Sequence, residues 1–371
     1  MATILDYLVW RGDLTFNTDP LNEVDNYILA KVGCPDYSGI VPRKGGAVLL
    51  RDAVPAFFGS RSKEEASFGV LASGAIAPVL KKLCGTQRFG EIHLAGFTKK
   101  LRPSSTEQFS ALTLLLPDKT AYISFRGTDD TLTGWKENMM MSVSDSIPAQ
   151  QDALAYLTAA SKWCSGPLIV GGHSKGGNLA VYAAAMADPA IQRRIRAVYN
   201  NDGPGFTKEF LQQEGYLRIR PKLHSLLPQF SLVGMMLERE KNVSIVKSPR
   251  PGPSAHDGFL WEVSGPRFVR CEQFSRSSLS FEESLHSVMD GMDTEARKTF
   301  ISQLFDTLEE AGASTVTDLS EMQARKALEL FRKVRNQPEV GKFLSSLIEL
   351  MIKDYASSTP AGRVIDKLWD R

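Results

Sequence analysis

The chain has few cysteines, and their spacing excludes several classes of protein. Its four cysteines, Cys34, Cys84, Cys164 and Cys271, stand far apart in 371 residues and form no C-x-x-C pair. Zinc ribbons, thioredoxin-like redox motifs and disulfide scaffolds are therefore excluded, and reduced thiols in the cytosol are expected.

The chain also lacks an excess of charge and a long uncharged apolar run. It has 44 Lys and Arg against 42 Asp and Glu, a net charge of +2, which gives no support for a nucleic-acid partner. No uncharged run reaches the roughly 18 residues that a membrane-spanning helix needs. Residues 1–6 carry an acid where a signal peptide needs basic residues. These observations favour a cytoplasmic protein, of bacterial origin, without a membrane span.

The middle of the chain alternates between strand-like and helix-like patterns. Residues 111–116 and 121–125 predict two strands joined by the turn at residues 117–119. Further apolar segments that predict strands are residues 168–171, 197–199, 223–227 and 243–246. Helices are predicted at residues 150–164 and 179–186. Such alternation is typical of an α/β fold whose mainly parallel sheet is covered by helices on both faces.

Beyond Cys271 the pattern becomes purely helical, with stops at Gly312, Pro338 and Pro360. We therefore expect two units. Residues 1–272 form an α/β domain with an N-terminal extension, and residues 273–371 form a helical appendage.

The strongest chemical signal is Gly172-His173-Ser174-Lys175-Gly176, which matches the G-x-S-x-G nucleophile elbow. A predicted strand precedes it and a predicted helix follows it, as the elbow requires. In that turn the serine hydroxyl is exposed at the end of the sheet, and the helix N-terminus offers N–H groups to an oxyanion. The motif predicts Ser174 as a nucleophile and the backbone N–H of Lys175 as an oxyanion donor.

A serine nucleophile needs a base, and the chain has five histidines: His93, His173, His224, His256 and His286. His256 follows a late predicted strand and a proline-rich loop, where the base of a Ser, acid, His chain order is found. His173, next to Ser174, is expected to point away from the nucleophile's side. His256 is therefore the predicted base.

The acid is predicted at Asp202, which follows the strand at residues 197–199 and precedes His256. There it would hold the imidazole in the tautomer that accepts the serine proton. A turn or helix-cap role for Asp202 stays open. Ser225, Glu238 and Asp257 are weaker alternatives.

A second oxyanion donor is predicted at the end of an earlier strand, in Phe125-Arg126-Gly127-Thr128. Gly127 permits a tight turn, and Thr128 offers a backbone N–H and a hydroxyl. An ordinary strand-end turn is the alternative.

These motifs resemble those of class 3 lipases, which have the α/β-hydrolase fold. More closely, the chain resembles a bacterial family of lipase-like hydrolases over roughly residues 1–270. The segments that carry this closer resemblance are residues 6–13, 22–25, 201–205, 228–234 and 256–257, with Trp261. The resemblance implies Ser174 as nucleophile, His256 as base, and Thr128 and the Lys175 backbone as oxyanion donors.

Two positions depart from the class 3 lipase pattern. Lys175 stands where an apolar residue is usual, and Ser225-Leu226-Leu227-Pro228 lacks the acid of the similar lipase segment. Either Asp202 supplies the acid or the triad is incomplete.

The sequence thus predicts a serine-dependent hydrolase of carboxylic esters, including lipid esters, that acts through an acyl-enzyme. No cofactor or metal is required, and transient contact with a lipid surface is compatible with such substrates. The alternatives are a weak or inactive hydrolase-fold binding protein, and a thioesterase or peptidase on the same fold. The apolar segments at residues 63–83 and 232–237 either flank an acyl-sized cleft or belong to the core.

Overall fold

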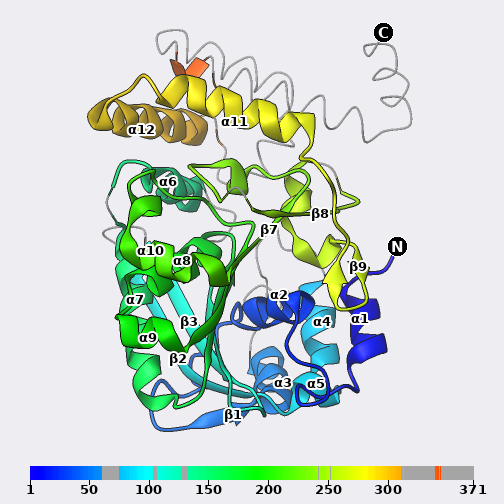
Figure 1. Cartoon of the computed structure of the whole chain (residues 1–371). Coiled ribbons are helices and arrows are strands. Elements are labelled where there is room, and N and C mark those ends of the chain that lie inside the picture. The colour runs from blue at the N-terminus through cyan, green and yellow to red at the C-terminus, as the bar shows by residue number, and fades with distance from the viewer. Residues whose placement is uncertain are drawn as a thin grey trace.

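One sheet of eight strands forms the centre of the part of the chain that the computed structural model describes (Figure 1). That part comprises residues 1–60, 75–102, 107–127, 132–144, 146–240, 242–250, 252–310, 312, 339–341 and 343. The strands are β1 (Ala47–Leu49), β2 (His93–Arg102), β3 (Glu107–Leu115), β4 (Ala121–Phe125), β5 (Leu168–His173), β6 (Ile195–Asn201), β7 (Leu223–Pro228) and β8 (Ser244–Val246). They lie in sequence order, antiparallel from β1 to β4 and parallel from β4 to β8.

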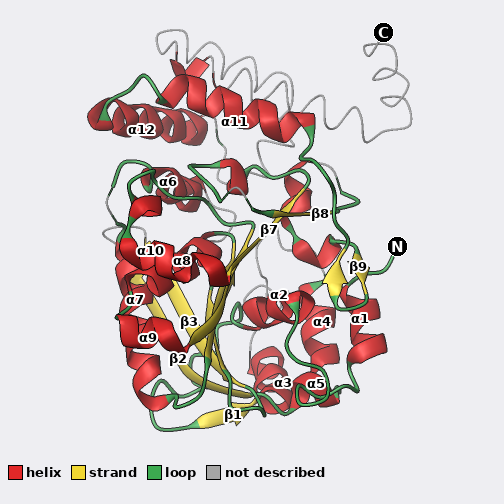
Figure 2. Ribbon diagram, viewed as in Figure 1, coloured by secondary structure: helices red, strands yellow, loops and turns green. Residues whose placement is uncertain are grey.

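Helices cover both faces of this sheet (Figure 2). One face carries α1 (Ile4–Arg11), α2 (Glu23–Val32), α3 (Leu50–Ser60), α4 (Ile76–Leu83) and α5 (Gln87–Gly90). The other carries α7 (Pro148–Trp163), α8 (Lys175–Met186), α9 (Pro189–Arg194) and α10 (Glu214–Ile219). The remaining helices are α6 (Leu132–Met140), α11 (Arg276–Met289) and α12 (Thr294–Glu310). Short 3-10 turns are η1 (Phe210–Gln212), η2 (Arg220–Lys222), η3 (Val233–Met235), η4 (Gly252–His256) and η5 (Gly258–Leu260), and a small hairpin is β9 (Val263–Ser264) with β10 (Arg267–Phe268).

The central strands are apolar along their whole length because both of their faces are buried. In β5, Ile169 packs among the helices α1 to α4, whereas Leu168 and Val170 pack with α7 and α8 on the opposite face. Successive side chains of a strand point to opposite faces, so a strand covered on both sides has no solvent-facing position. This explains the short apolar segments of the sequence and confirms the predicted parallel sheet.

The predicted hairpin is also confirmed. Strands β3 and β4 pair antiparallel, with Ala111 opposite Phe125 and Leu115 opposite Ala121. The helix predicted at residues 150–164 is α7, and the one predicted at residues 179–186 is α8, which begins earlier, at Lys175. Of the apolar segment at residues 63–83, positions 63–74 lie outside the described residues, and α4 buries Ile76, Val79, Leu80 and Leu83 in the core.

Helices α11 and α12 follow residue 272, and they lie across the end of the sheet next to α6 (Figure 1). Phe281 of α11 and Phe305 of α12 belong to one buried cluster with Leu132, Met139 and Met235. The C-terminal helices therefore share a core with loops of the α/β domain, and the boundary at residues 272 and 273 stays a prediction. No helix among the described residues is long and apolar enough to span a membrane.

Candidate active site

Ser174 lies at the sharp turn between β5 and α8. Its backbone has φ 58° and ψ −137°, a conformation that L-residues seldom adopt and that is typical of a nucleophile elbow. The Ser174 N–H donates to the Asn201 carbonyl (2.9 Å), and its carbonyl accepts from the Gly177 N–H (2.8 Å). These bonds hold the turn against β6 and the first turn of α8, so the strained backbone is fixed from both sides.

The two glycines of the elbow have no room for a side chain. A β-carbon on Gly172 would lie 2.3 Å from the Gly176 backbone. One on Gly176 would lie 2.1 Å from the carbonyl oxygen of Phe125, the last residue of β4. Both contacts are with backbone, which cannot move aside as a side chain can. Glycine is thus required here because helix, turn and neighbouring strand approach closely.

Replacing Gly176 with alanine should lower the free energy of unfolding by about 1–3 kcal/mol or more, because the new methyl group would overpack the elbow. Gly59 is the matched control: it lies in α3 and a β-carbon there would meet nothing within 4 Å. Gly59→Ala should leave stability unchanged or raise it by up to about 1 kcal/mol through helix propensity. Denaturant unfolding of both variants measures this, and equal midpoints would contradict the account of the elbow.

A carboxylate and an imidazole form a pair close to the elbow. His256, at the end of η4, donates from Nδ1 to Oδ2 of Asp202 over 2.7 Å. Asp202 follows β6, is fully buried, and has a positive φ of 48°. The Asp202 N–H donates to the Leu226 carbonyl (2.8 Å), which fixes this turn against β7. The sequence expectation that Asp202 would lie within hydrogen-bond reach of His256 Nδ1 agrees with this distance.

The alternative acids have other partners. Glu238 forms an ion pair with Lys208 at 3.4 Å. Asp257 accepts from the Phe259 N–H at 3.0 Å, which makes it the N-cap of η5. Of the three carboxylates, Asp202 is therefore the one that the structure brings to the His256 ring.

Contacts of neighbouring residues bring the turn at Ser174 close to the segments that carry both members of the pair. A β-carbon on Gly203, the residue after Asp202, would lie 2.4 Å from the Ser174 carbonyl oxygen. On the other side His173, the residue before Ser174, donates from Nε2 to the His256 carbonyl over 2.7 Å. The three predicted residues thus gather at one edge of the sheet, at the carboxyl ends of β5 and β6.

Ser231 is a site residue that sequence reasoning did not single out. Its hydroxyl donates to Asp202 Oδ1 (2.5 Å) and accepts from the Gly234 N–H (2.9 Å), while its own N–H donates to Ser278 Oγ of α11 (2.9 Å). A buried carboxylate needs such donors to stay ionised. Its position in the sequence could have indicated this role, because Ser231 follows β7, whose carboxyl end lies next to that of β6.

The end of β4 lies against the elbow, where the second oxyanion donor is predicted. A β-carbon on Gly127 would lie 3.1 Å from Ser174 Cβ. Thr128 itself lies outside the described residues, so its role stays a prediction. Lys175 begins α8, and the first N–H groups of a helix have no partner within it.

The side chain of Lys175, the residue after Ser174, is buried, which is unusual for a lysine. It is 1% exposed, and its ammonium pairs with Glu137 of α6. Sequence reasoning noted the unusual lysine but not this partner, because Glu137 is 38 positions earlier in the chain. The ion pair therefore links α6 to the first residue of α8, next to the elbow.

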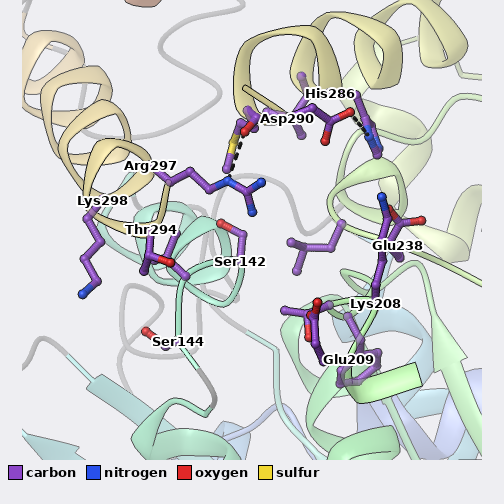
Figure 3. Close-up of a pocket in the computed structure, with 16 residues that line it drawn as sticks. Ser142, Ser144, Lys208, Glu209, Glu238, His286, Asp290, Thr294, Arg297 and Lys298 are labelled. Carbon is purple, nitrogen blue, oxygen red and sulfur yellow. Dashed lines mark hydrogen bonds and ion pairs between the residues drawn. The ribbon is translucent and has the colours of Figure 1, made fainter. Parts of the chain in front are cut away.

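A cavity of about 760 Å³ lies between the α/β domain and the C-terminal helices (Figure 3). Residues 206–209, residues 142–144 after α6, and parts of α11 and α12 line it, and the Arg297 side chain extends into it. Ser174, Asp202 and His256 are absent from its lining. Leu232, Met235 and Met236 are instead buried in the cluster that joins the site loops to α11 and α12. In the described part of the chain, no group of three or more His, Cys, Asp and Glu side chains is placed to hold a metal ion.

A comparison with models of protein families shows to which family the chain belongs. Residues 83–306 match the family model for Mbeg1-like proteins. The chain belongs to the Mbeg1-like family. The matched range runs from the end of α4 to α12, so it contains the elbow, Asp202 and His256. With its mostly parallel sheet, the elbow between β5 and α8 and helices on both faces, this Mbeg1-like protein is a lipase class 3-like α/β-hydrolase, as the sequence predicted.

Two solved structures are similar to this Mbeg1-like chain. Lipase II from Rhizopus niveus is 17% identical over 38% of this chain and 59% of the lipase, with a TM-score of 0.29. The match thus spans less than two thirds of that lipase. A triacylglycerol lipase whose catalytic centre is formed by a serine protease triad is 12% identical over 59% of this chain and 77% of its own, with a TM-score of 0.33. A comparison with curated protein sequences found no match.

Proposed function

We propose that the protein is a serine hydrolase of carboxylic esters, including lipid esters. The observation that carries this proposal is the Asp202–His256 hydrogen bond of 2.7 Å beside the elbow serine. A buried carboxylate that holds Nδ1–H leaves Nε2 of the same ring as the proton acceptor. Nucleophile, base and orienting acid are the groups that acyl transfer to water needs.

In the proposed reaction Ser174 Oγ attacks the ester carbonyl while His256 takes its proton. The Lys175 N–H and Thr128 stabilise the tetrahedral oxyanion, and His256 returns the proton to the departing alcohol. Water then attacks the acyl-enzyme while His256 takes its proton. His256 returns that proton to Ser174 Oγ as the carboxylic acid leaves. Asp202 orients the ring and stabilises the imidazolium, and the Ser231 hydroxyl bonds its other carboxylate oxygen.

The apolar surroundings of the acid favour an acyl substrate with a hydrocarbon chain. A β-carbon on Gly234 would lie 2.8 Å from Asp202 Oδ1. The next two residues, Met235 and Met236, are buried among apolar side chains. Methionine adapts its shape to bound groups, so this cluster suits a flexible acyl chain.

The values of kcat/KM for p-nitrophenyl esters should rise several-fold with each pair of acyl carbons from acetate upward, because each buried methylene contributes roughly 0.8 kcal/mol. Ser174→Ala protein, assayed beside the wild type, subtracts hydrolysis that does not depend on the site. A maximum at the acetate would reject the lipid-type substrate and favour a short-chain esterase. Turnover of thioesters or peptides in place of oxygen esters would assign the site to a thioesterase or peptidase.

A further inference from the structure

His173 connects the elbow to the loop that carries the proposed base. Its ring is buried, its Nε2 lies 2.7 Å from the His256 carbonyl oxygen, and the two imidazole centroids are 4.3 Å apart. On its other side, Nδ1 lies 3.4 Å from the Lys31 ammonium of α2. His173 therefore stands between a helix of the N-terminal extension and the main chain of His256.

These two contacts determine where the His173 proton is. A carbonyl oxygen only accepts hydrogen bonds, so Nε2 must carry the hydrogen that it donates to His256. An ammonium only donates, so Nδ1 must offer its lone pair to Lys31. The neutral Nε2–H tautomer satisfies both contacts, and the imidazolium form would lose the contact with Lys31.

Burial lowers the pKa of His173 well below its usual value, and the charge of Lys31 and the proximity of His256 lower it further. Among the described residues, the titratable groups that face His173 are Lys31 and Tyr27 from α2 and His256 from η4. His173 thus stays neutral while His256 takes up a proton, so two imidazolium rings never face each other at this distance.

Lys31 is itself held in place by aromatic rings. Its ammonium lies 5.8 Å from the ring centroids of both Tyr27 and Phe259, and the residue is 8% exposed. Among the residues that the structure describes, no carboxylate forms an ion pair with it. Tyr27 also accepts the Gly258 N–H at its hydroxyl (2.8 Å), so α2 holds the chain directly after Asp257.

We propose that His173 and Lys31 are positioning residues that hold the main chain of His256, so that its ring stays between Asp202 and Ser174. Among the described residues, Asp202 bonds the ring of His256 and makes no hydrogen bond to its main chain. The bond from His173 to the His256 carbonyl fixes the loop, and Lys31 fixes the tautomer that makes this bond. The proposal rests on the proposed function, in which His256 is the base.

The test compares His173→Leu, which removes the donor, with His173→Gln, whose amide can present an N–H near the position of Nε2. The measured quantity is the second-order rate constant for reaction of Ser174 with a fluorophosphonate. His173→Leu should lower it about 100-fold, as expected when a catalytic group is displaced by about 1 Å. His173→Gln should restore most of the rate. His224→Leu, on β7 and exposed, is the control and should react like the wild type.

Nitrogen NMR of the imidazoles supplies a readout that does not depend on activity. In the wild type His173 should be neutral at about pH 7 and should carry its proton on Nε2, because burial and the charge of Lys31 lower its pKa well below the usual value. If His173→Leu does not fold, Lys31→Met takes its place, and it should let part of the His173 population move its proton to Nδ1 and should slow labelling.

Three results would decide against the proposal. A folded His173→Leu or Lys31→Met protein that is labelled at the wild-type rate would overturn the positioning role. A His173 proton on Nδ1 in a wild-type protein that is labelled would overturn that role alone. A wild-type protein that is not labelled at all would overturn the proposed function, and the positioning role with it.

Discussion

Ser174→Ala should lower kcat for ester hydrolysis on the order of 10⁶-fold, the scale of loss when a nucleophile that acts together with its base is removed. The hydroxyl is the atom that forms the acyl-enzyme, and no other group at the elbow can replace it. Oxyanion donors and substrate binding would remain, so a small residual rate over water is expected. Steady-state kinetics on the best p-nitrophenyl ester measures the change.

Fluorophosphonate labelling of the same proteins provides the second measurement. Wild-type protein should be labelled at Ser174, and the alanine variant should not be labelled. Ser161→Ala is the matched control, because Ser161 is a buried serine of α7 whose hydroxyl donates to the Thr158 carbonyl of its own helix (2.9 Å). Equal labelling of Ser174→Ala and wild type would remove Ser174 from the mechanism and leave a hydrolase-fold binding protein as the better hypothesis.

Asp202→Asn should lower kcat on the order of 10⁴-fold, by analogy with the serine-protease triad. An amide N–H facing Nδ1 would place the imidazole proton on Nε2, where it blocks transfer from Ser174. The amide oxygen could still accept the Ser231 hydroxyl, so the fold should survive. Because the defect lies in proton transfer, kcat should fall with little change in KM.

The control for this carboxylate-to-amide change is Asp188→Asn. Asp188 caps α9 by accepting the Ala190 N–H (2.7 Å), and asparagine caps a helix equally well. That variant should keep wild-type activity and stability. An Asp202→Asn enzyme with nearly full activity would show that another group orients His256, with Asp257 the next residue to substitute.

The parts of the site that could be predicted from sequence depend on neighbours in the chain. The elbow is one such part, because Gly172, Ser174 and Gly176 lie within one turn and their backbone requirements are local. The strands are another, because residues buried on both faces produce apolar runs such as 168–171. His256 could be proposed from its place after a late strand, since parallel strands bring their carboxyl ends to one edge.

The choice of acid needed tertiary structure. Asp202 and Glu238 both lie between Ser174 and His256 in the chain, and Asp257 directly follows His256. Only the path of the η4 loop brings one of these carboxylates, that of Asp202, to within 2.7 Å of His256 Nδ1. The residues that support Asp202 and His256 could not be predicted from the sequence either, because their partners lie far away along the chain. Ser231 bonds Ser278, and Lys31 lies against His173, 142 positions later.

The sequence by itself determined the strand-to-helix turn, the residue proposed as nucleophile and the alternation that builds a mainly parallel sheet. All three follow from steric and hydrophobic requirements that act within a few residues. Tertiary structure alone decided which carboxylate faces His256, which buried groups contact the loop of His256, and that α11 and α12 share a core with the site loops. These depend on directional hydrogen bonds and on packing between segments whose separation in sequence leaves no local pattern.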